Sequence, residues 1–172
     1  MLLRLLSNFS DLNATSYHLY SMLKKSLTLL GLAALMTGAV RADDDQMAAG
    51  KAVYMTICFA CHQATGMGLP SVFPPLAKSE YVNGNPERFA AMILKGNLPP
   101  MTVDGKVYAA SPMPAQEAVL SDEKIAAVMT YVRGSFGNNS PAVSADVVAA
   151  ARKKLVDRKT SWTEAELKAW KD

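Results

Sequence analysis

The sequence lacks an excess of positive charge once its first 42 residues are set aside. It contains 18 Lys and Arg against 15 Asp and Glu, but four of the basic residues and only one of the acidic residues lie in its first 42 positions. From Asp43 onward the formal charge is therefore zero. A protein that binds nucleic acid through its phosphates would keep a basic excess there, so we expect no nucleic-acid partner.

The sequence also has no long apolar run that points to a permanent membrane anchor. The run from Ser26 to Ala39 is shorter than the ~20 residues that a spanning helix needs. It follows a short cationic stretch that begins at Met22, as in a secretory signal peptide. We therefore expect residues 1–42 to be a leader, with translation starting at Met22 and cleavage after Ala42. The mature protein is then periplasmic, and a membrane attachment is expected only if the leader stays uncleaved.

Cysteine and histidine are scarce, with two of each in the chain, yet three of these four residues fall within five positions. The segment Cys58-Phe59-Ala60-Cys61-His62 is the C-x-x-C-H pattern of haem attachment. At a helix end, two sulfurs three residues apart point the same way and can bond one edge of a porphyrin, while the next residue binds the iron. We predict one haem c, bonded covalently through Cys58 and Cys61, with His62 as an iron ligand.

Cys58 and Cys61 have other conceivable uses. A structural zinc ion would need two further ligands, and no other cysteine or histidine follows Ala42. A redox-active dithiol of the thioredoxin type is expected in a strand-helix-strand setting, which this region does not resemble. A plain structural disulfide or a helical bundle without a cofactor leaves the full five-residue pattern unexplained.

The second axial ligand is expected to be a methionine, because the other histidine, His18, lies in the predicted leader. Met113 is favoured, since Pro112 and Pro114 hold its segment extended and reduce the entropy lost when the segment closes over the haem. Met101 is the second choice. The full set of candidates is Met47, Met55, Met67, Met92, Met101, Met113 and Met129.

Three helices are indicated by apolar spacing and by capping residues. The first carries Met47, Gly50, Tyr54 and Ile57 on one face, the second runs from Asn85-Pro86 to Gly96, and the last follows Ser121 and carries Ile125, Val128, Met129 and Val132. Met92 and Met129 fit core positions on the second and last helices. Gly50 is unfavourable inside a helix by ~1 kcal/mol relative to alanine, so we expect another part of the chain to approach it closely.

The chain resembles the class I cytochromes c over about residues 45–138. Besides the C-x-x-C-H motif, the resemblance rests on Pro74-Pro75-Leu76, on Met113-Pro114 and on the start of the last helix at Leu120-Ser121-Asp122. It implies an all-α fold with three core helices around a covalently attached haem. It also implies that the last helix crosses the first near Gly50, through its face with Ile125, Val128, Met129 and Val132 and with Tyr131 alongside. It also implies that the Pro74 carbonyl accepts a hydrogen bond from the second ring nitrogen of His62, with Pro75 as the alternative acceptor.

The resemblance further implies an electron carrier and not an enzyme. An iron bound by His62 and Met113 has no open position for a substrate, so it exchanges single electrons with a donor and an acceptor protein through brief contacts. The carrier is expected to be a monomer, with Phe59, residues 66–70 and the Met113 loop around the haem edge. Two alternatives stay open: the electron-accepting cytochrome subunit of a periplasmic dehydrogenase or reductase, and a haem sensor with an open sixth position.

The last 32 residues lie beyond the resemblance. Three parts are therefore expected: the leader 1–42, a cytochrome c domain over residues 43–140 and a C-terminal helical extension over residues 141–172. Trp162 and Trp170, the only tryptophans, are expected to fix this tail to the domain; docking to a redox partner is the other role that they allow.

Within the tail, two helices are indicated. Ser144 is suited to begin a helix that reaches about Arg158. Thr163 and Glu166 have the spacing of a capping box, which predicts the start of a last short helix.

Overall fold

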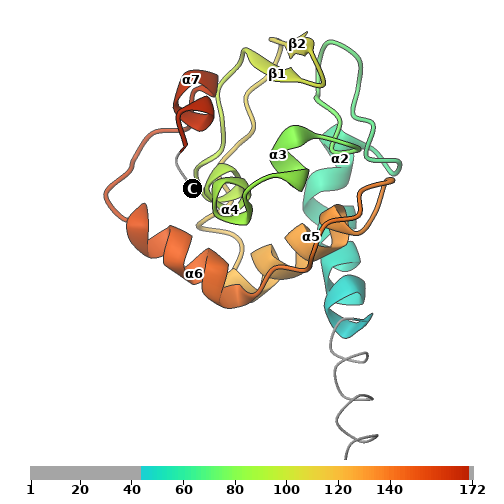
Figure 1. The fold of residues 1–172 in the computed structure, drawn as a ribbon, viewed down its shortest axis with the longest axis vertical. Helices are drawn as coiled ribbons and strands as arrows, with labels where there is room; N and C mark the ends of the chain where they lie inside the picture. Colours follow the sequence, from blue (N-terminus) through green and yellow to red (C-terminus); the bar gives the residue numbers. More distant parts are fainter. Residues whose placement is uncertain (1–43, 171–172) are drawn as a thin grey trace, which may run out of the picture. The chain divides into compact units, whose positions relative to one another are not determined.

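The computed structural model describes residues 44–170. The predicted leader lies outside the described residues, so its cleavage stays a prediction. Within the described part, helices pack around an apolar centre, and the named strands form one small hairpin (Figure 1). No helix of residues 44–170 is long and apolar enough to cross a membrane.

The chain is helical from residue 44 to His62, as the apolar spacing indicates, but this helix is not uniform. Residues 44–53 are α-helical, and a π-helical turn, η1 (Tyr54–Cys58), then leads into α2 (Phe59–His62). At the end of the π turn, the amide of Phe59 donates to the Tyr54 carbonyl five residues earlier. Such turns are rare and occur frequently at functional sites. The apolar pattern does not indicate it.

Gly50 allows this first helix to approach α5 (Asp122–Arg133) closely, as expected. A side-chain carbon at position 50 would collide with the Ala127 carbonyl and with the Tyr131 side chain. The contact is therefore made by the side of α5 that carries Ala127 and Tyr131. Tyr131 was expected alongside this contact, but the face with Ile125, which was expected to make it, lies in the core instead.

The predicted start and end of α4 (Pro86–Lys95) and the predicted start of α5 agree with the structure. The side chain of Asn85 accepts a hydrogen bond from the Arg88 amide at the start of α4, and Gly96 follows its last residue with φ +68°. The Ser121 hydroxyl accepts from the Lys124 amide at the start of α5. These caps satisfy backbone groups that would otherwise lack partners.

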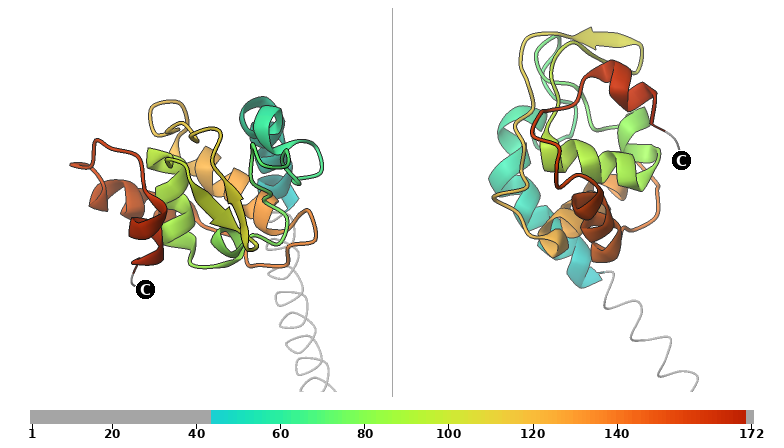
Figure 2. Two further views of the ribbon diagram at one scale, coloured as in Figure 1. Left: turned by 90° about the horizontal axis from the view of Figure 1, so that it is seen from above. Right: turned by 90° about the vertical axis from the view of Figure 1, so that its left-hand side faces the viewer.

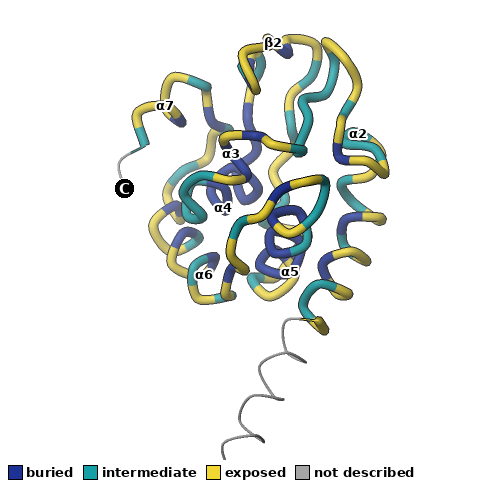
Figure 3. Tube along the Cα trace, turned by 45° about the vertical axis from the view of Figure 1, so that its right-hand side comes forward, coloured by how far each residue is buried: buried dark blue, intermediate teal, exposed yellow. Residues whose placement is uncertain are grey.

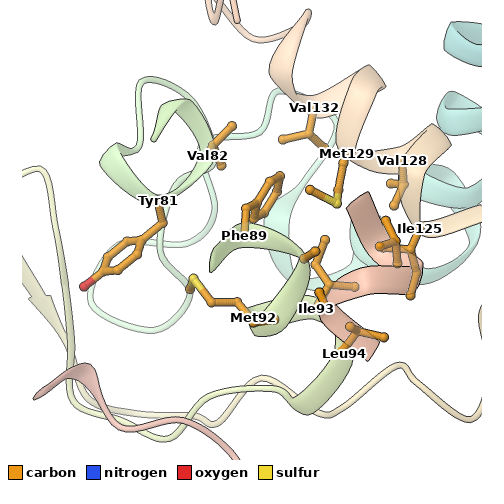
Figure 4. Packing of buried hydrophobic residues seen from close by; sticks show 14 of the residues in the cluster. Tyr81, Val82, Phe89, Met92, Ile93, Leu94, Ile125, Val128, Met129 and Val132 are labelled. Carbon is orange, nitrogen blue, oxygen red and sulfur yellow. The ribbon is translucent and has the colours of Figure 1, made fainter. Parts of the chain in front are cut away.

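The centre of the core lies between α4 and α5, whose buried residues stand out in Figure 3. The short helix α3 (Glu80–Asn83) adds Tyr81 and Val82. Met92 and Met129 occupy core positions as expected, with 8% and 0% of their surface exposed. In Figure 4, Phe89 and Ile93 of α4 lie on the side toward α5, while Met92 extends to the side of Tyr81. The core residues of the two helices are Phe89, Met92, Ile93 and Leu94 from α4, and Ile125, Val128, Met129 and Val132 from α5.

A β-hairpin between α4 and α5 was not anticipated. Strand β1 (Met101–Val103) pairs with the antiparallel strand β2 (Lys106–Tyr108). Asp104 and Gly105 form the turn, with φ of +50° and +69°. An Asp-Gly pair favours this kind of two-residue turn and is the sequence signal that could have indicated it. The residues of the hairpin that face inward, Met101, Val103 and Tyr108, are buried.

The C-terminal tail packs onto the same core. Helix α6 (Ala145–Lys154) contacts both α4 and α5, and α7 (Glu164–Lys168) follows a loop that returns along the molecule (Figures 1 and 2). Helix α6 begins after Ser144 as expected but ends before the predicted Arg158. The capping box is present, with reciprocal hydrogen bonds between Thr163 and Glu166.

Trp162 anchors the tail to α4. Its indole N–H donates to the Ala91 carbonyl at 2.9 Å, and its ring is buried. The ring of Trp170 packs edge-on against it with 5.6 Å between centroids, and the Arg158 guanidinium lies 3.5 Å from the Trp162 ring centroid. The same guanidinium pairs with Glu166 and lowers the pKa of that carboxyl to about 2. These contacts agree with the expectation that the tryptophans fix the tail to the domain.

Replacing Gly50 by alanine is expected to destabilise the protein, although alanine is favoured over glycine in a helix by about 1 kcal/mol. The added methyl group would collide with the Ala127 carbonyl, so the two helices must separate. Overpacking of this kind costs about 1–3 kcal/mol. Urea unfolding followed by circular dichroism should show a lower midpoint for G50A than for the wild type.

Gly134→Ala, at the end of α5, is the matched control. A side-chain carbon there would meet the end of the Met47 side chain at 3.4 Å, an ordinary contact distance, so the unfolding midpoint should change little. A G50A protein as stable as the wild type would contradict the close packing of the two helices.

Candidate functional site

A largely apolar cavity brings together all of the residues predicted to form a site. Its volume is about 1220 Å³, including the part open to solvent. Residues far apart in the sequence share its wall: Cys58, Cys61, His62, Pro74 and Met113.

Two thiols reach the cavity from the end of the first helix. Cys58 is the last residue of η1, and Cys61 lies one turn later in α2. Both are free cysteines and both are half-buried. Burial, and then the neighbouring Cys61 thiol, raise the pKa of Cys58 to about 11. The Cys58 thiol is therefore protonated at neutral pH, whereas a reactive dithiol needs a thiolate.

The ring of His62 is oriented by a backbone carbonyl. Its Nδ1 lies 3.0 Å from the carbonyl oxygen of Pro74. Because a carbonyl only accepts, Nδ1 carries the hydrogen in this contact, and Nε2 keeps a lone pair that can bind a metal ion. Burial lowers the pKa of His62, and the hydrogen bond to Pro74 opposes this change. The neutral imidazole, which is the form that binds metals, is favoured by its burial.

The loop that carries Pro74 is held by Asn138, a buried residue just after α5. Its side-chain oxygen accepts a hydrogen bond from the Lys78 amide at 2.7 Å. Its side-chain nitrogen donates to the carbonyls of Leu76 and Val132 at 3.0 and 2.9 Å. Asn138 thus connects this loop to the last turn of α5. Sequence reasoning missed it, since one asparagine in a loop gives no signal of its partners.

Met113 reaches the cavity from the loop that precedes α5, and its half-buried side chain packs against the core. Its backbone exchanges two hydrogen bonds with Asn97, at 2.9 Å from the Met113 amide and 3.1 Å from the Asn97 amide. Two other methionines, Met101 of β1 and Met92 of α4, also line the cavity. The structure therefore brings both favoured candidates for a sulfur ligand to one space without choosing between them.

The chemistry of the cavity wall fits a covalently attached haem. Two thiols at C-x-x-C spacing and an imidazole with a free Nε2 come from one helix end, and thioether sulfurs come from other elements. The wall between these groups is formed mostly by apolar side chains, including Phe89, Ile93 and Val128. A planar, largely apolar macrocycle that needs two sulfur attachments and axial nitrogen and sulfur ligands would match these groups.

Comparison with known proteins points the same way. The model of the family described as Cytochrome c matches residues 47–135. The chain is 32% identical over 163 residues to the cytochrome c subunit of a quinone alcohol dehydrogenase from Gluconobacter oxydans. It is 35% identical over 116 residues to the cytochrome c subunit of gluconate 2-dehydrogenase from Pantoea cypripedii, and 34% identical over 85 residues to cytochrome c-552 from Thermus thermophilus.

These three alignments differ in extent. They cover 93%, 66% and 47% of this chain, and 34%, 25% and 63% of the respective relatives. The chain therefore spans only about a third and about a quarter of the length of the two dehydrogenase subunits.

Replacing Asn138 by alanine is expected to destabilise the protein and to loosen the loop that orients His62. The substitution leaves the Lys78 amide without its partner, which costs about 1–3 kcal/mol, and it removes one hydrogen bond from each of the Leu76 and Val132 carbonyls, which keep other donors. The free energy of unfolding in urea should fall by at least that amount. Asn139→Ala is the matched control, because Asn139 is exposed, and it should unfold like the wild type. Equal stability of the N138A and N139A proteins would refute this role of Asn138.

Proposed function

We propose that this chain, which belongs to the cytochrome c family, is the electron-accepting cytochrome of an exported dehydrogenase or reductase. Members of the family carry haem c and transfer electrons. We place this chain in the periplasm, after removal of its leader 1–42. There it receives electrons one at a time from a catalytic partner and passes them on.

The extent of the similarity to dehydrogenase subunits carries this proposal. The alignment with the Gluconobacter subunit includes 93% of the 172 residues and so leaves out about 12 of them, fewer than the 32 residues of the tail 141–172. Part of the tail is therefore shared with that subunit. The family model, by contrast, ends at residue 135, and the alignment with cytochrome c-552 covers less than half of the chain. A tail shared with a subunit of an enzyme complex favours the same kind of assembly here.

Within this proposal, Cys58 and Cys61 attach one haem c, and His62 and Met113 bind its iron. A haem iron held by imidazole and thioether carries one electron and has a raised potential, because the sulfur favours the ferrous state. The Pro74 carbonyl keeps the hydrogen on Nδ1 of His62, so Nε2 is the metal-binding atom. The buried side chains of α4 and α5 exclude water from the inner part of the cavity.

A freely diffusing carrier is the second candidate. It is favoured by exposed apolar side chains beside the haem-attachment motif: Phe59, Met67 and Leu69 are 38%, 59% and 46% exposed. Small apolar patches of this kind suit brief contacts between redox proteins.

Purification of the tagged chain from its source organism, under mild conditions, distinguishes the two candidates. We expect a dehydrogenase or reductase subunit to copurify in fixed proportion, and the substrate of that partner to reduce the haem within the isolated complex. A chain that is isolated alone, and is reduced by small soluble redox proteins at any ratio, would show that it is a free carrier.

Met113→Leu tests the assignment of the iron ligand. We expect M113L to keep its covalent haem, to lose the far-red absorption band that reports methionine bound to ferric iron, and to have a lower midpoint potential. Met67→Leu is the control, because Met67 is exposed and is not part of the cavity wall, and it should keep the band. Loss of the band in Met101→Leu and its retention in M113L would assign the ligand to Met101.

A further inference from the structure

Residues 96–98, which follow α4, run between the Met113 loop and the C-terminal tail. On one edge, the amide and the carbonyl of Asn97 both pair with Met113. On the other edge, the Trp162 amide donates to the Gly96 carbonyl at 3.0 Å, and the Leu98 amide donates to the Trp162 carbonyl at 2.8 Å. Successive residues of an extended chain direct their polar groups to opposite sides, so one short segment pairs with both neighbours.

The outer edge of this arrangement is firmly attached. The Trp162 side chain is 8% exposed, and its indole N–H is bonded to the Ala91 carbonyl of α4. Trp162 therefore joins α4 through its side chain and residues 96–98 through its backbone. No other residue of the described tail makes a backbone hydrogen bond to residues 96–98.

The inner edge holds the Met113 loop against residues 96–98. A side-chain carbon on Gly96 would collide with the Met113 carbonyl and with the Ala115 amide, so the two segments are in tight contact. The far end of the loop is attached separately, since the amides of Gln116 and Glu117 donate to carbonyls near the end of α4. The part of the loop around Met113 therefore depends on residues 96–98 for its position.

We propose that Trp162 is a positioning residue for Met113, and that the tail thereby sets how often the methionine leaves the iron. The proposal rests on the proposed function in taking Met113 as the iron ligand. Without the indole hydrogen bond to the Ala91 carbonyl, the backbone of residue 162 separates more often from residues 96–98, and the Gly96 carbonyl and the Leu98 amide then lack their partners. The Met113 loop then opens more often.

Imidazole binding to the ferric holoprotein measures this opening. Added imidazole reaches the iron only when the methionine has left, so its apparent affinity rises in proportion to the open fraction. In Trp162→Phe, which keeps an aromatic ring but loses the indole N–H, we expect imidazole to bind about five- to tenfold more tightly at fixed pH, as for the loss of one buried hydrogen bond. The far-red methionine band reports the titration.

Trp170→Phe is the matched control. Trp170 lies in the same tail and contacts the Trp162 ring, but its backbone amide bonds within the tail, to the Leu167 carbonyl. Imidazole affinity should stay within about twofold of the wild type, a change well below that of one hydrogen bond. If W170F changes the affinity as much as W162F, a general loosening of the tail explains the effect and the proposal is wrong.

Amide hydrogen exchange gives a second measurement that does not depend on the iron ligand. In W162F the amides of Met113 and Leu98 should exchange faster, while those of Gln116 and Glu117 should not change. A wild-type protein without the methionine band would overturn the ligand assignment, and the exchange data would still decide whether Trp162 positions the loop. A wild type that shows the band, with unchanged affinity and exchange in W162F, would overturn the positioning role alone.

Discussion

The hydrogen bond between Nδ1 of His62 and the Pro74 carbonyl is the interaction on which the organisation of the site depends. It decides which ring nitrogen keeps a lone pair, and so to which side the histidine can bind a metal ion. It also requires the loop around Pro74 to be placed accurately against the end of α2. Asn138 provides that placement by joining residues 76–78 to the end of α5. The orientation of one imidazole is thus connected to the packing of the last core helix.

The two sides of the cavity depend on different parts of the chain. One side, with Cys58, Cys61 and His62, is built by η1 and α2. The loop that orients the His62 ring is held against α5 by Asn138. The methionine side is a loop without regular structure, positioned by residues 96–98 and by the end of α4. The tail, which lies beyond the part matched by the family model, contributes to the second side through Trp162. The C-terminal tail can thus influence the position of the Met113 loop, although no residue of the described tail lines the cavity.

Much of this could be predicted from local sequence signals. Caps at Asn85, Ser121 and Thr163 mark helix starts because each depends on residues only three positions away. The C-x-x-C-H motif is equally local. No comparable local signal exists for Asn138, whose partners lie up to 62 positions away, or for the side of α5 that meets Gly50. Both follow from the arrangement of whole elements in space. The choice among the methionines stays open for the same reason.

The π turn at Tyr54–Cys58 has a consequence for the orientation of the first helix. Residues in a regular α-helix follow one another at ~100°, so one additional residue in a turn rotates everything downstream by about that angle relative to everything upstream. The upstream part presents Gly50 to α5, and the downstream part presents Cys61 and His62 to the cavity. The wider turn therefore changes the direction in which the second half of the helix points its side chains. One continuous helix can in this way contact α5 and line the cavity, although these two surfaces lie on different sides of its axis.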